Sequence, residues 1–341
     1  MDEVSIIGID LAKRSFQLHG ARADGSVVFR KTLRRGKLLD FLASHPCCTV
    51  AMEACASAHY WGREFMKLGH EVRLIAPLYV KPFVKRQKND TADAEAICEA
   101  AARPTMRFVA VKGEAQQALG MVFRTRDLLV RQRTQTINAL RGHLAEFGIV
   151  APQGRAHVVG LAQAVEEMST SLPDAVREMG ALLLDQIAGL DGKIEALDKE
   201  LHARGRQDEE VARLMTIPGV GPVCASAIQA FAPPLESFRR GRDFAAWLGL
   251  VPRQHSTGGK PRLGKVSKMG QRDLRRLLIC GAMAVVRWAC RRGAPQGSWL
   301  ARMLAHKPRK LVAVALANKM ARIVWALTVK KEVYRAPAAA A

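Results

Sequence analysis

The apolar positions of the first hundred residues fall into two patterns. Short apolar runs of strand length occupy residues 4–10, 49–53 and 71–76. Between and after them, apolar residues recur at helical spacing over residues 58–68 and again over 90–102. Pro77 ends the third run, because proline cannot donate to a strand ladder. The pattern predicts strands that alternate with helices.

A hairpin signal lies between the first two of these strands. Apolar runs at 16–18 and 27–29 flank the turn residues Ala23-Asp24-Gly25-Ser26, and a short helix is predicted after them. Three antiparallel strands followed by strand–helix alternation is the order of a ribonuclease-H-like fold. The periodicity alone also permits another α/β sheet. We predict an α/β ribonuclease-H-like (Holliday-junction-resolvase-like) domain over residues 1–115.

The pattern becomes helical beyond this domain. Residues 116–147 read as one long helix rich in Arg and Gln. A later helix carries an a/d heptad seam, with apolar residues at alternating spacings of four and three. This seam fits either packing on the preceding helix of the same chain or contact with a second copy. We predict a helical, coiled-coil linker over residues 116–205. The seam comprises Leu183, Ile187, Leu190, Ile194, Leu197 and Leu201.

The charge distribution changes the picture after residue 205. The net charge is +22, and residues 239–310 hold eighteen Lys or Arg against two acids, Asp243 and Asp273. Such an excess indicates a polyanionic partner, of which nucleic acid is the commonest and an anionic membrane surface the competitor. We predict a mostly α-helical basic domain over residues 206–330, followed by a flexible tail at 331–341.

Several classes of protein are disfavoured by what the sequence lacks. The acidic N-terminus predicts no signal peptide, and Lys319 and Arg322 interrupt the apolar stretch 311–327, which is typical of a buried helix. Seven cysteines without a C-x-x-C pair predict reduced thiols rather than structural zinc. No phosphate-binding G-x-x-x-x-G-K-[ST] loop occurs. We expect a cytoplasmic, nucleoid-associated protein that needs no ATP and no membrane.

Four carboxylates are candidates for chemistry. Asp10 and Glu53 each end a predicted strand, and these strands are neighbours in a ribonuclease-H-like sheet. Asp90 and Asp93 lie three apart at a helix start, so they share one face. Carboxylates gathered in this way repel one another unless cations intervene, and hard oxygen ligands select Mg²⁺ or Mn²⁺. Two such ions roughly 4 Å apart can activate an attacking oxygen and stabilise a leaving one at a phosphodiester.

Each carboxylate also has a purely structural interpretation. Asp10 after an apolar strand suits a turn, and Asp90 with Asp93 suits a helix cap and an acidic third position. Glu53 is harder to explain in this way, because an acid inside an apolar strand needs a partner.

A glycine turn separates two predicted helices near the start of the basic domain. Residues 217–222, Ile-Pro-Gly-Val-Gly-Pro, precede the apolar run 223–231. Backbone N–H groups at such a helix start, around Gly219 and Gly221, can bind a DNA phosphate without reading sequence. The alternative is a tight turn in which glycine satisfies sterics alone.

A polar, glycine-rich segment at residues 249–260 is predicted to be a loop. Ser256 lies there between His255 and Thr257, with two glycines following. A hydroxyl among cations is well placed to attack a phosphodiester, although such a loop often binds phosphate only. A serine–phosphate link would keep the bond energy, so that strands are rejoined without ATP. The candidate nucleic-acid-binding cations are Arg253, Lys260, Arg262, Lys265, Lys268, Arg272, Arg275 and Arg276.

Six motifs, taken together and in order, cover residues 5–330. They are G-I-D-x-A-K, M-E-A, N-D-T-A-D-A, I-P-G-V-G-P, G-L-V-P-R-Q-H-S-T-G-G-K and S-K-M-G-Q-R-D-L-R-R-L-L. In this order they resemble the bacterial insertion-sequence transposases of family one-ten, whose relatives include pilin-gene invertases. The S-T-G-G-K form is similar to the one-eleven-eleven subgroup.

The resemblance implies a DEDD metal domain in which Asp10, Glu53, Asp90 and Asp93 fall on the four acidic positions. It implies a second, helical domain whose serine makes a covalent phosphoserine link with DNA. It also implies a structured noncoding guide RNA encoded in the element, which pairs with donor and target DNA. The resemblance further implies a homo-oligomer, dimer to tetramer, with active sites composed across protomers.

One departure from the family pattern concerns the nucleophile. The family often has Ser directly before Gly, whereas here Ser256 precedes Thr257. Serine is the family's residue type, so Ser256 is our choice, with Thr257 as the alternative. Two other functions stay open at this point: a metal-only Holliday-junction-type endonuclease that uses water, and a non-catalytic nucleic-acid-binding protein.

Overall fold

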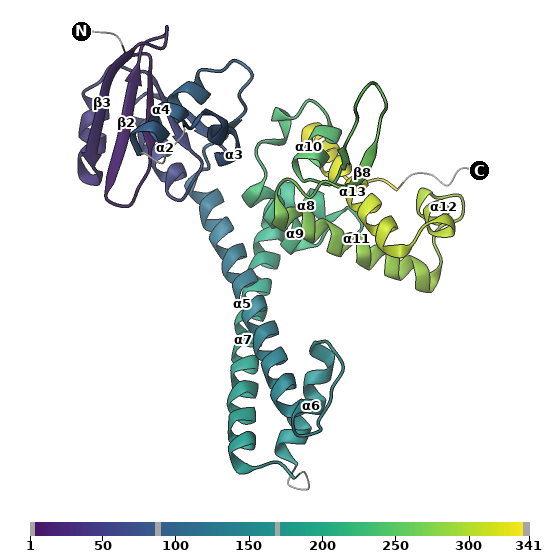
Figure 1. Ribbon diagram of the computed structural model, residues 1–341. Helices are drawn as coiled ribbons and strands as arrows, with labels where there is room; N and C mark the ends of the chain where they lie inside the picture. The colour runs from purple at the N-terminus through teal and green to yellow at the C-terminus, as the bar shows by residue number, and fades with distance from the viewer. Residues whose placement is uncertain (1–3, 86–89, 168–170, 337–341) are drawn as a thin grey trace. The chain divides into compact units, whose positions relative to one another are not determined.

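The computed structural model describes residues 4–85, 90–167 and 171–336, and of Asp90 the backbone alone (Figure 1). The chain divides into two compact units, residues 1–117 and 118–341. The finer division of the second unit near residue 205 stays a prediction.

The first unit is built on a six-stranded sheet. The strand order is β3-β2-β1-β4-β5-β6. Strands β1, β2 and β3 pair antiparallel, β1, β4 and β5 pair parallel, and β6 returns antiparallel to β5. This is the predicted ribonuclease-H-like arrangement with one unpredicted strand, β6, added at the edge. The strands are β1 (Ile6–Asp10), β2 (Ser15–Ala21), β3 (Val27–Arg34), β4 (Thr49–Glu53), β5 (Glu71–Ile75) and β6 (Phe108–Val109).

Helices cover both faces of this sheet, because alternate residues of β1 and β4 point to opposite faces. Ile7, Ile9 and Met52 pack with α1 and α2 in one core, while Ile6 and Ala51 pack with α4 in another. The helices of this unit are α1 (Leu38–Ala43), α2 (Ala58–Lys67), α3 (Pro77–Val80) and α4 (Asp90–Ala101), with 3-10 turns η1 (Arg35–Lys37) and η2 (Lys81–Phe83).

The second unit is almost entirely helical. Its one sheet is a two-stranded hairpin, β7 (Pro252–Gln254) and β8 (Leu263–Val266), where the sequence predicted a loop. The helices are α5 (Glu114–Ala145, which begins in the first unit), α6 (Val158–Glu166), α7 (Asp174–Gln207), α8 (Glu209–Met215), α9 (Pro222–Phe231), α10 (Gly241–Trp247), α11 (Arg272–Arg292), α12 (Trp299–His306) and α13 (Arg309–Lys330), with η3 (Arg155–His157) and η4 (Leu235–Ser237).

The heptad seam of α7 packs against α5 of the same chain. Ile187 of α7 joins Ile137 and Leu140 of α5 in a buried cluster. Two ion pairs fix an antiparallel register, Arg126 with Asp198 and Arg133 with Asp191, each at 2.5 Å. The intramolecular interpretation of the seam therefore holds, and contact with a second copy stays a prediction.

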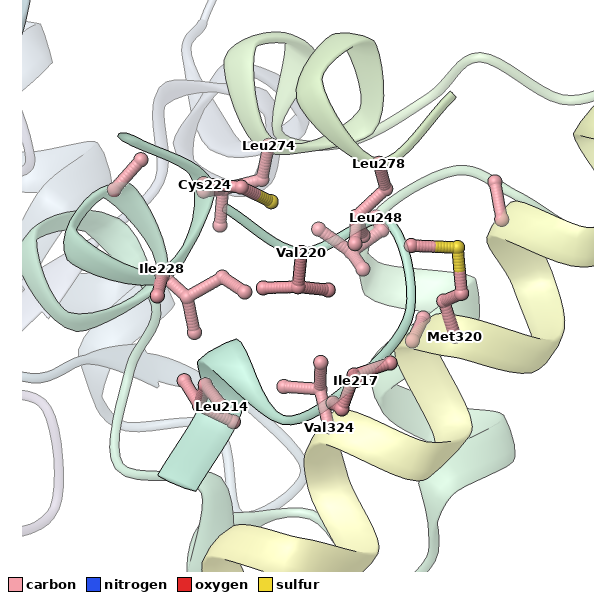
Figure 2. Packing of buried hydrophobic residues seen from close by; sticks show 14 of the residues in the cluster. Leu214, Ile217, Val220, Cys224, Ile228, Leu248, Leu274, Leu278, Met320 and Val324 are labelled. Atoms are coloured by element: carbon pink, nitrogen blue, oxygen red, sulfur yellow. The ribbon is translucent and has the colours of Figure 1, made fainter. Parts of the chain in front are cut away.

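The basic domain is organised around a core that collects residues from six helices, α5, α8, α9, α10, α11 and α13, and from the turns between them. Ile217 and Val220, from the turn between α8 and α9, point toward Leu278 of α11 and Val324 of α13 (Figure 2). Within the described residues, α13 is the one helix long and apolar enough to cross a membrane. Its inner face, Met320 and Val324 included, is fully buried in this core, as predicted for the apolar stretch.

Two glycines bring the backbones of the α8–α9 turn and α11 into direct contact. Gly219 has φ +87°, and a Cβ added to Gly281 would lie 1.9 Å from the Gly219 carbonyl oxygen. No rotamer change can relieve a clash with backbone, so the two elements would have to separate.

We therefore expect Gly281→Ala to lower the free energy of unfolding by about 1–3 kcal/mol or more, as overpacking does. Gly192→Ala is the matched control, because Gly192 lies inside α7 with open space around it. That change should raise stability by roughly 0.5–1 kcal/mol. Urea denaturation of both variants measures the difference, and equal effects would contradict the close packing.

Candidate active site

Asp10 and Glu53 lie side by side at one end of the sheet. Strands β1 and β4 are parallel neighbours with Ile9 opposite Met52, so the residues that follow these two are also adjacent. Since Ile6 and Ala51 point toward α4, Asp10 and Glu53, at even spacing from them, point to that face as well. The sequence predicted this convergence.

Helix α4 brings Asp93 close enough to Glu53 for their charges to interact. Gly8 permits the approach, because a Cβ there would lie 2.4 Å from the Ala94 carbonyl oxygen. Burial, and secondarily the charge of Asp93, raises the pKa of Glu53 above its usual range. Two carboxylates that repel in a half-buried site are held together by the fold rather than by mutual attraction.

Ser256 lies at the far end of the β7–β8 hairpin. The turn Thr257-Gly258-Gly259-Lys260 has positive φ at both glycines, +54° and +73°, which is the two-residue hairpin geometry that glycine favours. The Ser256 side chain is exposed, and its Oγ accepts a hydrogen bond from the backbone N–H of Arg262 at 3.1 Å. The hydroxyl is thus held on an ordered hairpin and open to a large substrate.

The predicted cations divide into two groups. Lys260, Lys265, Lys268 and Arg272 are exposed, as a phosphate-binding surface requires, and so is Arg262. The others have partners within the protein, which gives them structural roles as well. Arg253 donates to the Ser267 carbonyl at 3.2 Å, Arg275 to the Leu248 carbonyl at 3.0 Å, and Arg276 pairs with Asp127 of α5.

Comparison with known proteins identifies the family. A family model described as the transposase IS116/IS110/IS902 family matches residues 211–296, and a DEDD transposase model of the IS110 type matches residues 7–149. The chain is 50% identical to a probable family 20 transposase of Pseudomonas aeruginosa, over 97% of this chain and 99% of that protein.

Two further relatives are transposases of insertion sequences. Identity is 43% with the transposase of IS1328 from Yersinia enterocolitica, over 98% of this chain and 99% of that one. It is 38% with the transposase of IS1111A from Coxiella burnetii, over 98% and 92%.

The chain belongs to the IS110 family of transposases. This is family one-ten of the sequence motifs. As an IS110-family transposase, the protein acts on DNA, which it cleaves and rejoins during transposition. The DEDD type of its first domain agrees with the ribonuclease-H-like sheet and suggests a divalent metal cation.

The donor set of this transposase fits a hard divalent cation. Asp10, Glu53 and Asp93 supply carboxylate oxygens only, which are ligands for Mg²⁺ or Mn²⁺. Burial raises the pKa of Glu53 most, and the charge of Asp93 adds to this; a bound cation would offset both effects. Among the described side chains no three possible ligands are close enough to hold a metal, and the side chain of the fourth predicted ligand, Asp90, lies outside those described.

Cys55 is a neighbour of this site that the sequence did not single out. Burial first, and then the charges of Glu53 and Asp10, raise the pKa of its thiol. The thiol therefore stays protonated and is a poor ligand for a hard cation. The sequence could have indicated Cys55 by its position two residues after Glu53.

Glu95, two residues after Asp93 on α4, is a second residue that the sequence missed. Its carboxylate binds Lys85 at 2.6 Å and Arg30 of β3 at 3.4 Å. The hydrogen bond from Lys85 lowers the pKa of Glu95. These contacts tie the start of α4, which carries Asp93, to the chain before it and to the sheet.

We therefore expect Glu95→Gln to raise the Mg²⁺ or Mn²⁺ concentration needed for half-maximal DNA cleavage by about tenfold, as loss of groups that orient metal ligands does. Glu99→Gln is the matched control, since Glu99 lies one turn later on α4 and pairs only with Arg103 in the described structure. The metal titration of Glu99→Gln should match the wild type. Superimposed curves for both variants would show that Glu95 does not position the site.

The two glycines of the turn before α9 have different surroundings. Gly219 packs against α11, which is the steric interpretation of the turn. Gly221 precedes Pro222, is exposed and has open space where a Cβ would lie. Only Gly221 is thus exposed for phosphate binding at this helix start, and that role stays a prediction.

Proposed function

We propose that this transposase cuts and rejoins DNA through a covalent phosphoserine at Ser256. The exposed Ser256 hydroxyl, which accepts a hydrogen bond on the hairpin among exposed cations, is the observation that carries the proposal. The serine oxygen would form a bond to phosphorus as one strand's oxygen leaves. A second strand end would then attack the same phosphorus and release serine. One phosphodiester is thereby exchanged for another without ATP.

The carboxylates have a separate part in this proposal. Asp10, Glu53, Asp90 and Asp93 would hold Mg²⁺ or Mn²⁺, and a divalent ion supplies stabilisation of charge on phosphoryl oxygens. Support comes from the all-oxygen donor set and from the electrostatic contact between Glu53 and Asp93. Lys260, Lys265, Lys268 and Arg272 would bind the DNA backbone beside the hairpin.

Target choice is assigned to a structured noncoding RNA encoded by the element. The net charge of +22 favours binding of nucleic acid, and base pairing would supply the specificity that a charged surface lacks. Sequencing the RNA that co-purifies with the full chain tests this. Recovery of random cellular RNA, without enrichment for the element's own ends, would reject a guide.

A homo-oligomer, dimer to tetramer, completes the proposal. Large apolar side chains are exposed on both long helices, among them Met121 and Leu128 of α5 and Met179 and Leu182 of α7. A second copy would bury them. The mass of the full chain by light scattering, with and without nucleic acid, tests the state directly.

The experiment for the central claim is trapping of the intermediate. Reaction mixtures denatured at early times should contain protein covalently joined to DNA, and peptide mapping should place the link at Ser256. Cleavage without any such adduct would instead support a metal-only junction endonuclease.

A further inference from the structure

One tryptophan of the five is exposed and has no aromatic or cationic partner among the described residues. Trp61 is buried in the first unit, and Trp247 stacks on Phe244. Trp325 donates to two backbone carbonyls, and Trp299 is covered by the Lys319 ammonium at 5.0 Å from its ring. Trp288 of α11 is 55% exposed, and the described structure shows no ring or cation against it.

The surroundings of Trp288 are strongly basic. Arg291 and Arg292 lie three and four residues further along α11, so they share the face of Trp288, and Arg287 precedes it directly. All three arginines are exposed, and none forms an ion pair within the described part of the chain. Residues 274–331 contain thirteen Lys or Arg and no Asp or Glu.

This surface is apart from the proposed nucleophile. Ser256 lies on the β7–β8 hairpin, which precedes the start of α11, whereas Trp288 is near the other end of that helix (α11 in Figure 1). The sixteen residues from Arg272 to Trp288 correspond to about 24 Å at the α-helical rise. A strand held at both places would span several nucleotides.

We propose that Trp288, with Arg287, Arg291 and Arg292, forms a binding site for single-stranded DNA, in which the indole stacks on an unpaired base and the arginines bind flanking phosphates. Charge complementarity identifies a polyanion, and the uncovered indole identifies one with accessible bases, because bases inside a duplex offer no face for stacking. Strand exchange by a transposase separates DNA strands, which supplies such a ligand. The inference depends on activity on DNA but not on Ser256 as the nucleophile.

Fluorescence anisotropy with the full chain tests the site. The probes are a labelled oligo(dT) of about 15 nucleotides and a blunt duplex of the same length. Trp288→Ala should weaken oligo(dT) binding roughly tenfold, within the range measured for base–aromatic stacking, and duplex binding less than about twofold. Trp288→Phe should retain most of the affinity. The double variant with Arg291→Gln and Arg292→Gln should weaken the binding of both probes and reduce the salt dependence of Kd.

Two measurements separate stacking from a structural or packing role. Oligo(dT) should quench tryptophan fluorescence of the wild type but much less that of Trp288→Phe. Leu311→Ala is the matched control, because it also removes an exposed apolar side chain, in this case from α13. It should leave both affinities unchanged. The proposal is overturned if Trp288→Ala weakens the binding of both probes equally, or if quenching persists in Trp288→Phe. It is also overturned if Trp288→Ala changes the oligomeric mass or the binding to anionic vesicles but leaves oligo(dT) binding unchanged. Because the assay contains no cleavage step, its failure is independent of that of the serine mechanism.

Discussion

Asp10→Asn and Glu53→Gln are each expected to reduce DNA cleavage by about a thousandfold. Both substitutions keep the size of the side chain but remove the charge that would hold a divalent cation. A bound metal contributes several kcal/mol to stabilising a phosphoryl transition state, and each 1.36 kcal/mol corresponds to a factor of ten in rate. Cleavage of a labelled element-end substrate, followed across an Mg²⁺ and Mn²⁺ titration, measures the loss.

The same variants should fold normally. For Glu53→Gln, the change removes a charge that repels Asp93, so the thermal unfolding midpoint should be unchanged or raised. Asp40→Asn, an exposed carboxylate of α1 paired with Lys37, is the control and should cleave like the wild type. If Asp10→Ala combined with Asp93→Ala still recombines DNA, the carboxylates are structural and the metal proposal is wrong.

The sheet and the long helices could be predicted because apolar residues recur in each at the spacing typical of that secondary structure. The β4 prediction matches residue for residue, since Val50 and Met52 alternate with residues of the opposite face between clear turn signals. Strand β6 could not be predicted in this way. It has two residues, and its strand geometry comes from pairing with β5, more than thirty residues earlier in the chain.

The β7–β8 hairpin shows a different reason for an error. All three residues of β7 are exposed, so the sequence has no alternation of apolar and polar residues that would indicate a strand there. The segment was therefore predicted to be a loop. The usable signal was Gly258-Gly259, a dipeptide that favours the two-residue turn joining antiparallel strands. The correction matters for function, because it places Ser256 on a hydrogen-bonded ladder rather than on a free loop.

The sequence predicts which residues carry suitable chemical groups, but it does not show most of their contacts within the fold. The carboxylates Asp10 and Glu53 end two strands, and their convergence could be predicted because the order of the elements indicated a ribonuclease-H-like sheet in which these strands are parallel neighbours. The partners of Arg275 and Arg276 lie in distant parts of the chain, so their structural contacts were invisible in the sequence. Glu95 is recognisable only once Lys85 and Arg30 are seen around it.

Ser256→Ala is expected to abolish the covalent protein–DNA adduct and to reduce strand exchange by about 10⁴-fold or more, as removal of the nucleophile does in other enzymes with covalent intermediates. The fold should survive, because the lost hydroxyl is exposed and accepts a single hydrogen bond from the Arg262 backbone. Such a bond contributes about 0.5–1.5 kcal/mol at most. Denaturing gels of the reaction with labelled DNA measure the adduct.

Thr257→Ala is the control that decides between the two adjacent hydroxyls. The two hydroxyls lie on adjacent residues beside the hairpin turn, so removing one leaves the other in place. If Ser256 is the nucleophile, Thr257→Ala keeps the adduct and Ser256→Ala loses it, whereas the reverse result assigns the chemistry to Thr257. If Ser256→Ala still cleaves and the wild type gives no adduct, water is the nucleophile, and the hairpin then serves to hold phosphate rather than to attack it.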